Sequence, residues 1–165
     1  MKTLEETINY KLNIVPYKFI ENYNLNFEEA NELFIETKKW IWLLAISNIN
    51  REKDKNVPTP LFIDSSMIFI DEMWHTFILF TYEYEKFCME CFGFFIHHYP
   101  TTKYEKDQFK QELTNNRELK IKEVTGNTKN QYSYIYDRLG KETLIKWYHE
   151  YPIKYSPPNI KKLQS

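Results

Sequence analysis

Apolar residues in this chain recur at spacings of three and four, and no segment alternates between apolar and polar residues for long. The clearest case follows Asn26, a good helix N-cap, and its apolar positions are Phe27, Ala30, Leu33, Phe34, Trp40, Ile41 and Leu44. This spacing puts them on one face of a helix that ends near Asn48. Because the chain also has only three glycines, tight turns are few, and the sequence predicts an all-α fold.

We expect a single-domain helical bundle of about six to seven helices over residues 1–152, followed by an extended C-terminal tail over residues 153–165. The first helix begins at a capping box formed by Thr3 and Glu6. The other expected helices cover residues 17–23, 27–48, 66–92, 103–124, 130–139 and 141–151. The helix over 66–92 is the long central one, and Gly93 ends it. Residues 50–60 are predicted to form a polar loop, and Gly126 is predicted to break the chain between two helices.

Composition and charge argue against two classes of partner. The net charge is −1 and the lysines form no concentrated basic stripe, so we expect no nucleic-acid partner. No uncharged stretch is long enough to cross a bilayer, so we expect no membrane partner. The first residues lack the apolar core of a targeting signal, and two cysteines without such a signal favour a reducing compartment. These features together predict a cytoplasmic location.

The central helix carries the residues with the clearest chemical potential. Asp71 and His75 are four positions apart, so they share one helical face with Leu79 and Tyr82. We expect this stripe to face inward, with Asp71 and His75 in direct contact and at least one of them mostly buried. A carboxylate and an imidazole can bind a transition metal together, and they can equally form a paired, buried core contact.

A thiol and two more imidazoles, Cys88, His97 and His98, follow within one further helix length. On a straight helix His75 and Cys88 would be about 20 Å apart, so one ion could not contact both. A combined site therefore requires a bend near Thr81, which can cap a second helix. A zinc site of the Cys/Cys plus His/His kind would need His97 and His98 to fold back over Cys88 and Cys91, and the spacing between the two pairs is short of the usual zinc-finger pattern. We expect both thiols to be reduced and not joined to each other, with burial in an aromatic core as the alternative to metal binding.

Residues 70–98 resemble a known family. The pattern Asp71-x-x-Trp74-His75-Thr76, followed by Tyr84, Cys88, Phe92-Gly93 and His98, is similar to the characteristic segment of the glycine-rich-domain-containing-protein-like family. The chain departs from that pattern in two places: Phe77 replaces a histidine, and Phe80-Thr81 replaces a Ser-Pro pair. A weaker similarity is Tyr136-x-x-Leu139-Gly140 followed by Trp147. The resemblance implies no established activity and no defined cofactor.

Two functions from different classes remain open. In the first, Asp71, His75, Cys88 and His98 bind a divalent metal, zinc or ferrous iron. In the second, the chain is a non-catalytic helical protein-interaction module whose Asp/Trp/His cluster is structural. Its candidate contacts to a protein partner are late tyrosines, at positions Tyr132, Tyr134, Tyr136, Tyr148 and Tyr151. No phosphate-binding loop, serine elbow or HExxH motif is present, so the sequence identifies neither a substrate nor an enzyme class.

Overall fold

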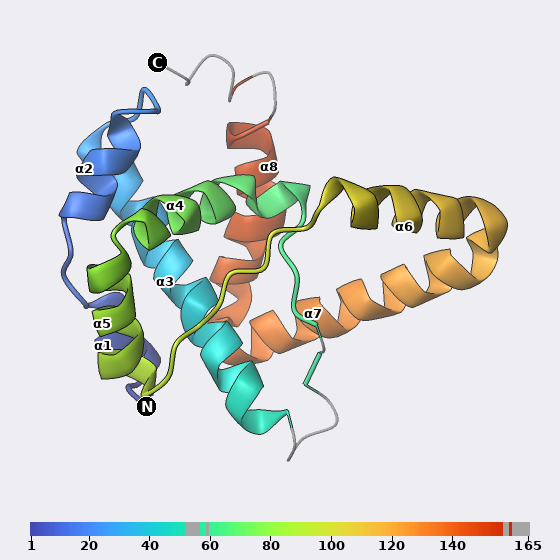
Figure 1. Cartoon of the computed structure of the whole chain (residues 1–165), viewed down its shortest axis with the longest axis horizontal. Coiled ribbons are helices and arrows are strands. Elements are labelled where there is room, and N and C mark those ends of the chain that lie inside the picture. Colours follow the sequence, from blue (N-terminus) through green and yellow to red (C-terminus); the bar gives the residue numbers. More distant parts are fainter. Residues whose placement is uncertain (52–56, 59, 157–158, 160–165) are drawn as a thin grey trace.

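The structure, a computed structural model, describes residues 1–51, 57–58, 60–156 and 159. Every element of regular secondary structure in these ranges is helical, which confirms the all-α prediction (Figure 1). In chain order the elements are α1 (Leu4–Ile8), α2 (Ile14–Ile20), α3 (Phe27–Asn50), the 3₁₀ turn η1 (Ser65–Met67), α4 (Ile68–Leu79), α5 (Thr81–Phe92), α6 (Lys103–Asn115), α7 (Arg117–Ile145), the π-helical segment η2 (Lys146–Glu150) and α8 (Tyr151–Lys154).

Helix α3 runs through the core, and α1, α2 and α4 pack against it. It begins where the sequence predicts, because the Asn26 side chain accepts a hydrogen bond from the Glu29 backbone N–H. Its inner face buries large side chains, among them Trp40, Ile41 and Phe34. Helix α4, which is the first part of the predicted central helix, makes the most extensive of these contacts with α3. The capping box of Thr3 and Glu6 at the start of α1 is also confirmed.

The predicted central helix is two helices with a sharp break between them. Phe80 leaves helical geometry with φ −87° and ψ 65°, so α4 ends at Leu79 and α5 begins at Thr81. Helix α5 ends at Gly93, whose φ of 82° lies in the left-handed region that suits glycine. The chain then returns toward α4 as an extended segment that leads into α6 (Figure 1). The bend that a combined site requires is therefore confirmed.

The inward-facing stripe was predicted on the wrong side of α4. His75 is exposed, and Leu79 and Tyr82 are each 71% exposed. The buried face of α4 instead carries Phe69, Ile70, Met73, Trp74 and Phe77. This face holds more aromatic area than the predicted stripe, and burying that area stabilises the fold more.

The late helices also differ from prediction. The break falls at Asn116, with φ −134° and ψ 49°, so α6 ends at Asn115 and α7 runs through Gly126 without interruption. A single glycine inside a helix is tolerated at a modest cost, so Gly126 does not stop α7. Gly140, with φ 84°, does interrupt helical geometry, as the predicted boundary there implied. Helix α6 buries no residue and projects with the start of α7 as a helical hairpin (Figure 1).

Helix α8 places the end of the packed region later than the predicted boundary at residue 152. It continues to Lys154, and the following Tyr155 is buried with its ring stacked on Phe69 at 4.3 Å between centroids. Residues 52–56 and 59 of the predicted loop, and 157–158 and 160–165 of the predicted tail, lie outside the described residues. Among the described helices, none combines the length and apolar character that a bilayer crossing requires.

Candidate metal centre

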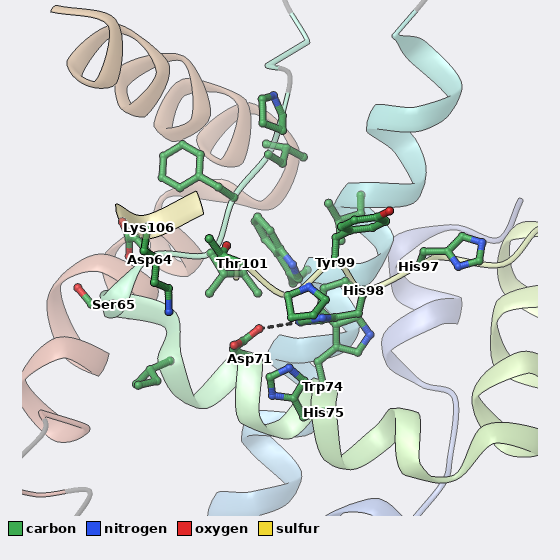
Figure 2. A pocket seen from close by; sticks show the side chains of 18 residues that line it. Asp64, Ser65, Asp71, Trp74, His75, His97, His98, Tyr99, Thr101 and Lys106 are labelled. Carbon is green, nitrogen blue, oxygen red and sulfur yellow. Dashed lines mark hydrogen bonds and ion pairs between the residues drawn. The ribbon is translucent and has the colours of Figure 1, made fainter. Parts of the chain in front are cut away.

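Three potential metal ligands meet where the extended segment passes α4. Asp71 and His75 come from successive turns of α4, and His98 comes from the segment after α5 (Figure 2). One ligand atom from each of the three side chains lies within 4.8 Å of the other two. In a tetrahedral zinc site with bonds of about 2.0–2.1 Å, ligand atoms are roughly 3.3 Å apart. Small side-chain rotations would therefore bring the three ligand atoms to an ion.

The contact that Asp71 makes differs from the predicted one. Its Oδ1 atom lies 2.9 Å from Nε2 of His98, while no hydrogen bond joins it to His75 in the part of the chain that the structure describes. The Asp71 side chain is 30% exposed and His75 is exposed, so the predicted direct, mostly buried pair is wrong. The reason is that His98, which lies on the segment after α5, contacts the Asp71 carboxylate instead. The ring centroid of His75 lies 4.5 Å from that of His98.

Two aromatic residues fix the position of His98. The indole Nε1–H of Trp74 donates to the Tyr84 hydroxyl at 3.0 Å, and that hydroxyl donates to the carbonyl oxygen of Ile96 at 2.6 Å. Trp74 also packs against the His98 ring in a T-shaped arrangement, with ring centroids 4.4 Å apart. Burial raises the pKa of the Tyr84 hydroxyl, which therefore keeps its proton and remains a donor. The two hydrogen bonds through the Tyr84 hydroxyl therefore connect α4, α5 and the extended segment at the site.

The extended backbone separates the two adjacent histidines. Side chains alternate along it, so Ile96 is buried while His97 is exposed. The His97 ring packs against Phe95, 4.9 Å away, and points away from the cluster in Figure 2. Of this adjacent pair, only His98 is placed to act as a ligand with Asp71.

Cys88 lies outside the cluster of three. Its thiol is buried in α5 and hydrogen-bonds with the backbone of Ile96, so it anchors the same segment as Tyr84. Burial raises the pKa of Cys88, and it raises the pKa of Cys91 to about 11, so both thiols are neutral at physiological pH. The two cysteines are free, as predicted from their spacing. The structure thus brings together three of the four predicted ligands.

A cavity of about 740 Å³ opens beside the cluster. Its walls come from α3, α4, the start of α6, the stretch before η1 and the extended segment. The residues that line it include Asp71, His75 and His98 together with Trp40, Leu44, Leu61, Ile63, Trp74 and Lys106. Small-molecule pockets are usually about 300–1,000 Å³ and largely apolar, and this cavity fits both descriptions.

Gln131 of α7 holds one wall of that cavity, and sequence analysis missed it. Its Oε1 accepts from the Phe62 backbone N–H at 2.9 Å, and its Nε2 donates to the Phe62 carbonyl, also at 2.9 Å. The same Nε2 donates to the hydroxyl of Tyr148 at 2.8 Å. These partners are 69 and 17 positions away in sequence, so no local pattern could have identified the residue.

Most of the late tyrosines serve packing rather than a free surface. Tyr134 and Tyr151 are buried, and Tyr132 packs on Tyr148 with ring centroids 4.2 Å apart. Tyr136 is 52% exposed. Only this last tyrosine retains the exposure expected of a contact residue for a protein partner.

Residues 56–122 match the UCP032817-like family, which is uncharacterised. This range covers less than half of the chain and includes all three cluster residues, Cys88 and Lys106. The match does not confirm the resemblance to the glycine-rich-domain-containing-protein-like family. No curated protein and no solved structure gave a significant match.

Proposed function

We propose that this protein binds a divalent transition metal, zinc or ferrous iron, through Asp71, His75 and His98. The observation that carries the proposal is the proximity of the three ligand atoms, all within 4.8 Å of one another on elements separated in sequence. Two imidazoles and one carboxylate are a ligand set used by catalytic zinc and by non-haem ferrous iron. Cys88 is not part of the proposed set because its buried thiol is directed to Ile96.

Three protein ligands leave at least one coordination position for water or another ligand. Here that position would adjoin the cavity, which the same three residues line. An ion held this way lowers the pKa of bound water or polarises a bound oxygen atom. The proposal therefore concerns an accessible metal centre rather than a closed structural one, and it assigns no reaction. The cytoplasmic location remains a sequence-based expectation.

The competing proposal is that the Asp71–His98 contact is only a structural link inside an interaction module. The two differ in what purified protein contains and in what each ligand contributes. A structural link needs Asp71 and His98 but gives the exposed His75 no role. A metal centre needs all three side chains.

The test measures two quantities for the wild type and for each variant. Mass spectrometry gives the metal content after expression in metal-replete medium, and calorimetry gives the affinity for zinc. The variants are Asp71→Asn, His75→Ala and His98→Ala, and His97→Ala is the matched control because it is adjacent but points away. We expect about one ion per chain in the wild type and in the control, and loss of that ion in the three variants. A wild type that binds no ion, or an ion retained after His75→Ala, would contradict the proposal.

A further inference from the structure

We propose that the cavity beside the metal centre binds a small carboxylic acid with an apolar body. This inference deepens the proposed function and rests on it, because the cavity and the metal centre share Asp71, His75 and His98. Two features carry it beside the metal centre: the apolar walls, and a lysine without an anionic partner among the described residues.

The walls are suited to an apolar body. Leu44, Leu61 and Ile63 are each half-buried and line the cavity together with Trp74. A ligand that covers them would remove apolar area from water, which is favourable in proportion to that area. Aromatic walls are also typical of small-molecule sites.

Lys106 supplies a positive charge. It lies on α6 and lines the cavity, and no ion pair is found for it in the described ranges. In Figure 2 it lies with Asp64 on the side of Asp71 opposite the two histidines. The Asp64 Oδ1 atom accepts from both the backbone N–H and the hydroxyl of Ser66. The ammonium of Lys106 is therefore available to an anionic ligand.

The charge balance favours a carboxylate over a phosphate ester. The lining has one lysine and no arginine among the described residues, and it already holds the carboxylates of Asp64 and Asp71. A phosphate ester carries more negative charge and is usually held by several cations or an arginine fork. A single carboxylate needs only the available lysine and the open coordination position of the metal.

The test measures ligand binding by calorimetry on metal-loaded full-length protein, with metal content determined on every sample. The probes are a panel of aryl and short alkyl carboxylates led by phenylpropanoate, with phenylpropanamide as its neutral analogue and phenyl phosphate as the alternative anion. Lys106→Gln is the exposed, fold-neutral variant, and Lys103→Gln on the same helix but outside the cavity is its control.

We expect phenylpropanoate to bind at least about tenfold more tightly than its amide or phenyl phosphate. Lys106→Gln should weaken its binding by about tenfold, whereas Lys103→Gln should not. Metal-loaded protein that binds none of the carboxylates, or that binds them equally well after Lys106→Gln, would overturn this inference and leave the metal centre intact. Tighter binding of phenyl phosphate would overturn the carboxylate assignment. If the proposed metal centre itself were wrong, the protein samples would contain no bound ion.

Discussion

Trp74 is the residue that joins the two halves of the candidate metal centre. It lies on α4 between Asp71 and the break, donates to Tyr84 of α5, and packs its edge on His98. The sequence placed it beside the candidate ligands but did not predict its hydrogen bond, because the acceptor lies beyond a change in chain direction. The indole N–H of Trp74 therefore helps to position His98 although Trp74 is not itself a candidate ligand.

Replacing Trp74 with Phe should lower the free energy of unfolding by about 1–3 kcal/mol and also weaken zinc binding. The substitution removes the donor to Tyr84 and loosens the segment that positions His98. Urea denaturation and zinc calorimetry measure the two effects. The matched control is Trp42→Phe, which removes an indole hydrogen bond to the Lys2 carbonyl far from the site. Equal zinc affinity in both variants would argue against the positioning role.

Lys38 is a second residue whose buried environment has a testable consequence, the pH dependence of stability. It is buried in α3, donates to the carbonyl oxygens of Ile8 and Tyr10, and burial lowers its pKa from 10.5 to about 8. Between these values the unfolded chain binds more protons at Lys38 than the folded chain does. Its contribution to stability should therefore be complete above pH 10.5 and decrease as the pH falls toward 8.

We therefore expect the stability of wild type relative to Lys38→Met to increase between pH 8 and pH 10. Taking the difference between the two proteins removes the opposing effect of buried tyrosines such as Tyr23, whose raised pKa acts on both. Urea denaturation at several pH values measures it. A difference that stays flat or declines over this range would show that Lys38 remains charged when buried.

At the scale of single elements, two glycines show what sequence can and cannot decide. Both Gly93 and Gly126 were predicted to end helices, and only Gly93 does so. Its φ of 82° requires a residue without a Cβ atom, whereas Gly126 sits inside regular helix. A glycine permits either state, so packing against the rest of the chain decides between them. The sequence indicated a bend near Thr81 only as the condition for a combined site, because Thr81 can cap a second helix, and it did not predict the buried face of α4.

Alanine at these two positions should change stability in opposite directions. Gly93→Ala should lower the free energy of unfolding by about 1–2 kcal/mol, because an alanine is strained in the left-handed region. Gly126→Ala should raise it by up to about 1 kcal/mol, because alanine favours the helix. A Cβ atom added at either position would have no described heavy atom within 4 Å beyond its own local backbone, so steric overlap does not confuse the comparison. Thermal and urea unfolding give both signs, and the same sign for both would contradict the assignment.

At the scale of the whole molecule, distant segments are tied together by buried polar groups. Glu36 of α3 is 2% exposed and accepts from Trp147 of η2 at 2.8 Å and from Lys39 at 2.9 Å. Gln131 ties α7 to the cavity wall in the same way. Sequence analysis predicted the helices that carry these residues but not the long-range contacts, which join positions 69 and 111 apart. Three of the four predicted ligands nevertheless converge, since the bend near Thr81 limits where the segment after α5 can return.

Replacing Trp147 with Phe should destabilise the protein more than replacing Trp40 with Phe, by about 1–3 kcal/mol. The two indoles pack edge to face at 5.9 Å, and both substitutions remove similar apolar area. Trp147 donates to a buried carboxylate, while the Trp40 N–H has no partner to lose among the residues that the structure describes. Urea denaturation of the two variants measures the difference. Equal losses would mean that the Glu36 contact contributes little to stability.

X-ray absorption spectroscopy of the zinc-loaded protein would identify the atoms bound to the metal. We expect a first shell of nitrogen and oxygen only, at about 2.0–2.1 Å, with the outer scattering of two imidazoles. The imidazole scattering should fall by half in any zinc that His98→Ala retains. A sulfur shell at about 2.3 Å would place a cysteine such as Cys88 at the metal and contradict the account. So would a zinc shell without imidazole.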